Sequence, residues 1–187
     1  MIPGLIIGGV VLILIIWWIS INNRLVALKN NRESAFADID VQLKQRYDLI
    51  PQLLGAVKGY MNHESEVLIK VTEARSRAMQ ASTISEKIAA EATLGAAMNG
   101  FNMQIEAYPD LKANANFMNL QNEIGDIENK LAAVRRFFNS ATKEYNNAIE
   151  QFPSNIIAGI KKYTKEPMFD LGVDQRQTLD KAPEISF

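Results

Sequence analysis

Apolar and polar positions divide the 187-residue chain into two unlike parts. Residues 5–21 are almost uninterruptedly apolar, and no charged side chain precedes Arg24. At about 1.5 Å per residue, a helix over this run reaches roughly 26 Å, close to the hydrocarbon thickness of a bilayer. The pattern therefore predicts one transmembrane anchor over residues 1–23. Its marker residues are Leu5, Gly8, Trp17, Trp18 and Ile21.

The ends of the apolar run favour a retained anchor. Trp17 and Trp18 fall at its C-terminal end, where indole rings prefer the headgroup boundary. A cleaved secretory signal is the competing interpretation, but no basic side chain precedes the run and residues 20–23 make a poor cleavage site. Gly4 and Gly8 have the small-xxx-small spacing that lets two membrane helices approach closely.

Basic residues near the run predict its orientation. Arg24, Lys29 and Arg32 follow it, and none precedes it. The positive-inside rule then predicts a single-pass protein of the cytoplasmic (inner) membrane, with its N-terminus outside and its body in the cytoplasm.

The longest helical pattern in the body is an apolar seam with steps of three and four residues, and Pro153 ends it. Such a seam over five heptads is typical of a coiled coil or a bundle helix. Its positions are Phe117, Leu120, Ile124, Ile127, Leu131, Val134, Phe138, Ala141, Tyr145, Ala148 and Phe152.

Three further helices are expected in the body. One continues from the anchor to about residue 59, and Pro51 within it predicts a kink. A second begins near Asn62, and the capping-box pair Thr83 and Glu86 opens a third. The prediction is an all-α protein: a transmembrane helix continuing into an elongated antiparallel bundle of about four helices over 24–153. An extended tail over 154–187 would dock on the bundle or on a neighbouring chain.

Composition excludes much chemistry. The chain has no cysteine and one histidine, His63, without a second histidine at zinc-protease spacing from it. No phosphate-binding glycine loop or nucleophile elbow occurs. A net charge of -1 argues against nucleic acid as a partner. We therefore predict a non-enzyme with no catalytic, cofactor-binding or metal-ligating residues.

Charged residues beside the apolar stripes are candidates for structural pairing. Arg46 lies just before Pro51, and Glu123 and Glu128 flank the seam at g and e positions, where side chains commonly pair across helices. We expect Arg46 to meet Glu123 or Glu128. The alternative is an exposed face of charges that contributes little to stability.

Motifs in a fixed order along almost the whole chain resemble the LemA family. They comprise 40–54, 57–64, 74–75, 108–114, 120–123, 128–129, 135–139, 145–146, 152–153, 182–183 and Phe187. Phe138 departs from the family pattern, which usually has Tyr there. The resemblance implies one N-terminal membrane helix, a long α-helical body and no catalytic residues.

Three non-enzymatic functions are consistent with this pattern. The first is a membrane-anchored helical scaffold or adaptor that forms a homo-oligomer or binds another membrane protein. The resemblance to the LemA family implies one such partner, a membrane metalloprotease in envelope protein quality control. The second is a membrane-shaping or membrane-sealing coat, for which Lys161-Lys162-Tyr163 is the candidate lipid-facing cluster. The third is a sensor or peptide receptor that uses the tail or the loop from Tyr60 to His63.

Overall fold

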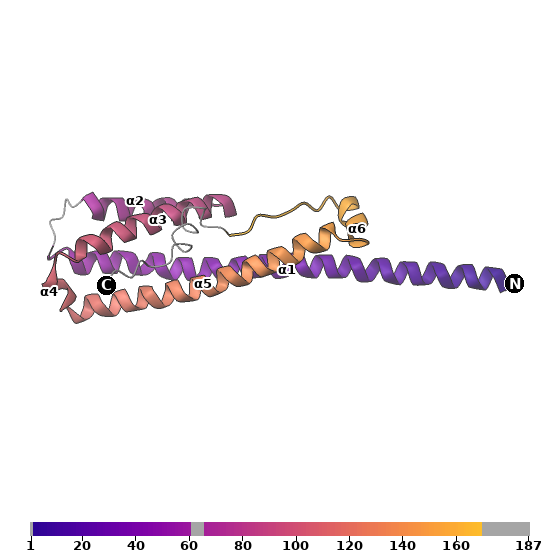
Figure 1. Cartoon of the computed structure of the whole chain (residues 1–187), viewed down its shortest axis with the longest axis horizontal. Coiled ribbons are helices and arrows are strands. Elements are labelled where there is room, and N and C mark those ends of the chain that lie inside the picture. The colour runs from indigo at the N-terminus through magenta and orange to yellow at the C-terminus, as the bar shows by residue number, and fades with distance from the viewer. Residues whose placement is uncertain (1, 61–65, 170–187) are drawn as a thin grey trace, which may run out of the picture. The chain divides into compact units, whose positions relative to one another are not determined.

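The computed structural model describes residues 2–60 and 66–169, and within them it has only helices and connections (Figure 1). The helices are α1 (Ile2–Val57), α2 (Glu66–Gln80), α3 (Ile84–Ile105), α4 (Pro109–Lys112), α5 (Ala115–Glu150) and α6 (Ser154–Ile160). The all-α fold with one long N-terminal helix is confirmed. The expected start of the second helix, near Asn62, lies outside the described residues, as does the tail from residue 170.

Contacts divide the described chain into two compact units. The first unit comprises residues 2–40 and 132–168, and the second comprises residues 41–131 with Phe169. Helices α1 and α5 each contribute to both units without interruption.

The first unit pairs the N-terminal part of α1 with the C-terminal part of α5 in antiparallel fashion. Leu25 shares a core cluster with Ala148 of α5 and Ile157 of α6. Farther along, the rings of Phe36 and Phe138 lie 5.5 Å apart. Helix α6 packs back on α1 through its buried face, so this unit is a small bundle closed by α6.

The second unit packs a short-linked α2–α3 hairpin alongside the C-terminal part of α1 (Figure 1). Two helices of this unit, α3 and α5, begin where a side chain satisfies free backbone donors. At α3, the predicted capping box forms: Thr83 Oγ1 accepts from the Glu86 amide at 3.2 Å, and the Glu86 carboxylate accepts from the Thr83 amide at 3.0 Å. At α5, Asn114 Oδ1 accepts from the amides of Asn116 and Phe117. The fully buried side chains at the core of this unit include Leu43, Ile50, Leu94, Phe101, Leu111, Phe117 and Leu131.

The apolar seam of α5 is used inside the chain. Its positions from Phe117 to Ala148 are buried, except that Val134 is half-buried. The last position, Phe152, lies beyond the end of α5 and is exposed. The seam therefore supplies the intramolecular core of both units.

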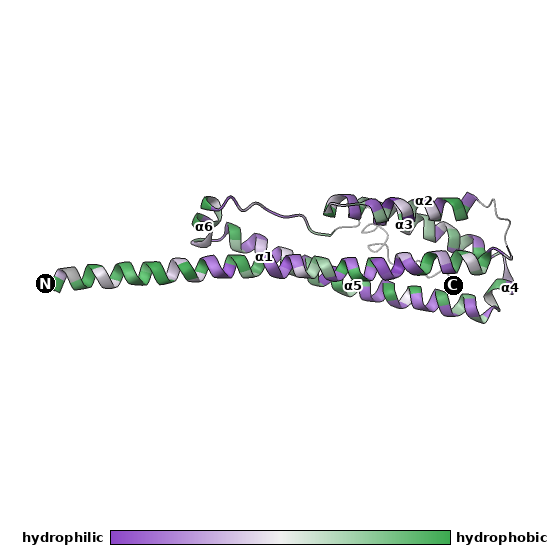
Figure 2. Ribbon diagram, turned by 180° about the vertical axis from the view of Figure 1, so that it is seen from behind, coloured by the Kyte–Doolittle hydropathy of each residue, from purple (hydrophilic) through white to green (hydrophobic). Residues whose placement is uncertain are grey.

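Figure 2 shows that hydrophobic residues are concentrated at the N-terminal end of α1, whereas hydrophobic and hydrophilic residues are interspersed over the other helices. Among the described residues, α1 is the one helix long and apolar enough to cross a membrane. Leu5, Trp17 and Trp18 are exposed. Gly8 has open space around it. Ile21 packs against the core cluster of the first unit. Other helices of the chain therefore begin to cover α1 at the residue where the apolar run ends.

Candidate functional site

A buried ion pair lies at the centre of the second unit. Arg46 on α1 donates from Nη1 to Glu91 Oε2 on α3 at 2.8 Å, and the Tyr47 hydroxyl donates to Glu91 Oε1 at 2.6 Å. Both oxygens of Glu91 are therefore occupied, and all three side chains are buried. We call Arg46, Tyr47, Glu91 and Glu128 the Arg46 cluster.

The structure brings together one of the two acid pairings expected for Arg46. Its Nε lies 3.0 Å from Glu128 Oε1 on α5, an ion pair at contact distance without the alignment of a good hydrogen bond. No ion pair joins Arg46 to Glu123 in the part of the chain that the structure describes. Glu123 instead lines a shallow depression of about 380 Å³ with Asp48, Asp126 and Lys130.

Glu91 is the member of this cluster that sequence reasoning missed. It lies three residues after Ile88 and three before Leu94, on the apolar face of α3. Arg46 lies in the same way on the buried face of α1, between Leu43 and Ile50. Opposite charges on two buried faces are the signal that could have paired them, because a buried charge requires a partner.

The Tyr47 carbonyl does not receive its usual hydrogen bond from within α1, because residue 51 is proline. In a regular helix the amide of residue 51 would donate to the carbonyl of residue 47, but proline has no N–H. Helix α1 nevertheless runs on to Val57. Arg75 of α2 donates from Nε to the Tyr47 carbonyl at 2.6 Å and replaces the missing donor. The expected kink at Pro51 stays a prediction.

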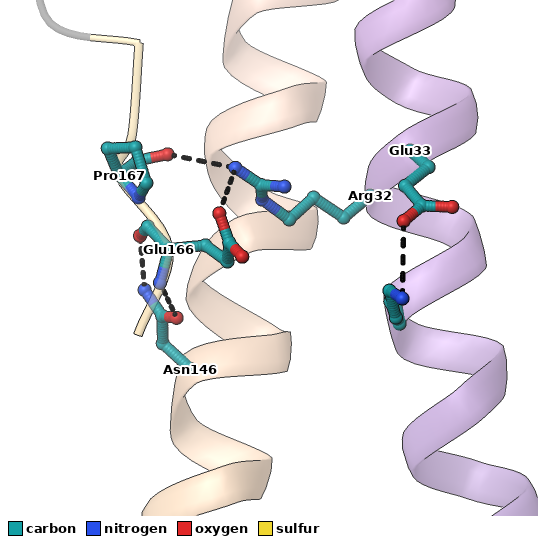
Figure 3. A network of polar contacts seen from close by, with 6 residues as sticks. Arg32, Glu33, Asn146, Glu166 and Pro167 are labelled. Carbon is teal, nitrogen blue, oxygen red and sulfur yellow. Dashed lines mark hydrogen bonds and ion pairs between the residues drawn. The ribbon is translucent and has the colours of Figure 1, made fainter. Parts of the chain in front are cut away.

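A second network, in the first unit, holds the extended segment after α6 (Figure 3). Arg32 reaches from α1 to Glu166, with Nη2 at 3.1 Å from the carboxylate, and to the Pro167 carbonyl at 3.4 Å. Its guanidinium also lies 5.1 Å from the centre of the Phe138 ring. We call Arg32, Phe138, Asn146, Glu166 and Pro167 the Arg32 cluster.

Asn146 binds the backbone of Glu166 through both ends of its side-chain amide. Nδ2 donates to the Glu166 carbonyl and Oδ1 accepts from the Glu166 amide, each at 2.9 Å (Figure 3). This reciprocal pair has the donor and acceptor pattern that a neighbouring strand would offer. The described beginning of the predicted tail is therefore bound to α5 through its main chain as well as through its charge.

Arg32 was foreseen as a charge that sets orientation, and its buried role was missed. It follows Leu25 by seven residues and precedes Ile39 by seven, which places it on the buried stripe of α1. Its acid partner lies in a segment without helical periodicity. Periodicity therefore could not identify Glu166.

Electrostatic effects in these regions are local. Burial raises the pKa of the Tyr145 phenol, and the neighbouring Glu166 carboxylate adds to the effect. At the start of α3, hydrogen bonds from the backbone amides of Thr83 and Ser82 lower the pKa of Glu86 to about 2. The pKa shift of Tyr145 thus follows mainly from burial, and that of Glu86 from the hydrogen bonds of a helix cap.

The arrangement offers structural pairing. Glu91 is saturated by Arg46 and Tyr47, and the Glu166 carboxylate is paired with Arg32. No group of three potential metal-ligating His, Cys, Asp or Glu residues occurs among residues 2–60 and 66–169. His63 lies outside those residues.

These features define an all-α protein with one candidate membrane-spanning helix. A family model described as the LemA family matches residues 35–187. The chain belongs to the LemA family. It is similar to Protein LemA of Metamycoplasma hominis, with 27% identity over 137 residues, which is 73% of this chain and 63% of that protein. The match thus spans less than two thirds of the relative's length.

Proposed function

We propose that this chain is a non-enzymatic, membrane-anchored helical scaffold. The observation that carries the proposal is the continuity of α1, which runs from the exposed apolar residues into the packed body as one helix from Ile2 to Val57. A continuous helix fixes the position of the adjoining body more firmly than a flexible linker does. The pairing of the buried charges within the chain supports a structural role over a catalytic one.

The scaffold would assemble with further copies of itself or with another membrane protein, such as a membrane metalloprotease. Because the α5 seam is consumed within the chain, self-association has to use other surfaces. The membrane-spanning part of α1 offers one, because its apolar side chains are exposed and Gly4 and Gly8 have the small-xxx-small spacing. Small residues at such a position allow two helices to approach closely in lipid.

The full-length protein in polymer-bounded lipid discs tests the scaffold. Mass photometry is expected to show more than one copy of the chain per disc, or a defined complex with a second membrane protein. Gly8→Ile should weaken self-association more than Gly9→Ile, which lies about 100° around the helix. A chain that is strictly monomeric and has no membrane-protein partner would contradict the proposal.

Location and orientation are part of the proposal: the cytoplasmic (inner) membrane, with the body on the cytoplasmic side. The chain has no cysteine, so Met103→Cys introduces a unique thiol at an exposed position of α3. A membrane-impermeant maleimide added to spheroplasts should label it only after lysis. Labelling of intact spheroplasts would place the body outside.

A further inference from the structure

Helix α6 is fixed against α1 immediately after the apolar run. Ile157 and Ala158 are buried with Leu25, and Ile21 packs on the same cluster. Leu25 follows Ile21 by four residues, which is about 6 Å along a helix. Within the first unit, the turn between α5 and α6, together with α6 itself, therefore lies at the end from which the apolar part of α1 emerges (Figure 1).

A row of large apolar side chains is exposed at this end. Phe152 is 80% exposed, and Ile156 and Ile160 follow at intervals of four residues with 51% and 64% exposure. The buried side of α6 is already covered by α1 and α5, so these residues face outward from the unit. Apolar side chains gathered in this way mark an interaction surface.

Two exposed lysines adjoin this row. Lys161 is the C-cap of α6, and Lys162 follows it with a φ of 56°. Hydrogen bonds from the Tyr163 amide to the Ala158 carbonyl and from the Lys162 amide to the Gly159 carbonyl form a Schellman motif. Glycine is the usual residue at this left-handed position, and a side chain there costs about 1–2 kcal/mol. A lysine thus brings a cation at a conformational cost.

We propose that Phe152, Ile156, Ile160, Lys161 and Lys162, here called the juxtamembrane patch, insert into the surface of the bilayer that α1 spans. The apolar row enters the boundary between headgroups and acyl chains, and the lysines bind the phosphates of anionic lipids. The inference rests on the membrane anchoring proposed above.

The level of the patch along α1 favours lipid as the occupant. Each headgroup layer is about 5–7 Å thick outside the hydrocarbon core. With Ile21 at the edge of that core, Leu25 and the α6 residues packed on it lie within about one headgroup layer. Apolar side chains next to cations are also the composition of an interfacial helix.

Three single-cysteine variants of the full-length protein, each carrying a nitroxide label, test the inference in vesicles. Ile160→Cys reports the patch, Ile13→Cys reports the middle of the span, and Met103→Cys reports the body. The three native side chains are matched in exposure at 64%, 65% and 69%. The readout is the accessibility of the label to oxygen, which concentrates in lipid, relative to a water-soluble nickel chelate.

The ratio of oxygen accessibility to nickel-chelate accessibility at Ile160→Cys is expected to be well above that at Met103→Cys. It should be below that at Ile13→Cys. Equal ratios at 160 and 103, with a lipid-like ratio at 13, would overturn the inference and leave the anchor intact. A water-like ratio at 13 would instead overturn the anchoring itself. Protection at 160 that disappears as the protein is diluted in lipid would identify a second copy as the occupant and also overturn the inference.

The role of the lysines is tested with the same label. Lys161→Gln/Lys162→Gly should lower the ratio at Ile160→Cys in vesicles of phosphatidylcholine with phosphatidylglycerol, and change it little in phosphatidylcholine alone. Arg136→Gln/Lys143→Gln, which neutralises two exposed basic residues on α5 in the same unit, is the matched control. An equal change in both lipids would overturn the assignment of the lysines to anionic headgroups.

Discussion

At the scale of single residues, the Arg46 cluster combines a buried acid with a half-exposed one. Glu91 is buried within hydrogen-bonding distance of two donors, whereas the Glu128 side chain is 42% exposed. Removing one partner of a buried ion pair leaves an uncompensated charge, whereas an exposed partner is readily replaced by water. The two acids that bind the same arginine therefore differ in their contribution to folding.

Substitution of these acids should reveal that difference. Glu91→Gln is expected to lower the free energy of unfolding by about 3–5 kcal/mol, and Glu128→Gln by less than about 1 kcal/mol. The measurement is chemical denaturation in detergent, followed by circular dichroism. Replacing all three buried partners by Arg46→Met/Tyr47→Phe/Glu91→Met should recover most of the loss, because the buried charges are removed together and Glu128, which is 42% exposed, can be hydrated. Equal losses for the two single variants would contradict this account.

Glu86 provides a prediction about pH. Its pKa of about 2 lies below the ordinary value of 4.5, so the capping interaction favours the ionised carboxylate. The stabilisation is fully present above about pH 4.5 and is lost as pH falls through 2. Carbon-13 NMR of the Glu86 carboxyl should give a midpoint near 2, and Thr83→Ala should raise it. A wild-type midpoint near 4.5 would show that the capping box does not form in solution.

Sequence and structure agree unevenly at this scale. The Thr83 and Glu86 cap was predictable because its partners are three residues apart. Glu91 and Glu166 were not, because their partners are 45 and 134 residues away in the chain. Periodicity locates a charge on a buried face, but it does not show which distant charge faces it.

At the scale of helices, the Arg75 side chain on α2 compensates for the backbone hydrogen bond that Pro51 removes from α1. Arg75→Leu leaves the Tyr47 carbonyl without its donor and should lower the free energy of unfolding by about 1–3 kcal/mol. In a Pro51→Ala background, the alanine amide supplies the missing hydrogen bond, so the same substitution should cost less than half as much. Denaturation of the four proteins in a double-mutant cycle measures the coupling.

The matched control is Arg77, which lies on the same helix with an exposed pairing to Glu73 at 3.9 Å. Arg77→Leu should change stability by less than about 0.5 kcal/mol in either background. Strictly additive effects of Pro51→Ala and Arg75→Leu would show that Arg75 does not replace the missing donor.

The hydrogen bonds between Asn146 and the Glu166 backbone lead to a second prediction at this scale. Asn146→Leu removes both hydrogen bonds to the Glu166 backbone, so exchange of the Glu166 amide with deuterium should accelerate by about ten-fold or more, which corresponds to about 1.4 kcal/mol. Asn147→Leu, at the exposed neighbouring position, should leave the rate unchanged. Unaltered exchange in Asn146→Leu would show that the Asn146 hydrogen bonds do not protect the Glu166 amide.

At the scale of the whole molecule, the apolar pattern predicted which residues are buried and that a bundle within one chain buries them, but not which helices meet. The α5 seam has the spacing of a coiled coil, and helices of the same chain cover it, as the expected bundle requires. An apolar stripe specifies only that it needs cover. The place of α6 beside the end of the apolar run likewise could not be predicted, because it depends on long-range contacts with Leu25.

This use of the seam predicts the oligomeric state of the body. A variant lacking residues 2–20 should be monomeric by light scattering at micromolar concentration, because the removed residues carry the surface assigned to self-association. The full-length protein in lipid should contain more than one copy of the chain. A stable dimer of the shortened chain would transfer the interface to the body and would argue against Gly8.

The bond between Arg75 and the Tyr47 carbonyl also has a consequence for how the family changes over time. A proline at position 51 creates a need for a donor from outside α1, and a basic side chain at position 75 meets it. Loss of the proline would relax selection on position 75, whereas loss of the basic residue first would pass through a less stable protein. In related chains the two positions should therefore vary together, with position 51 tending to change first.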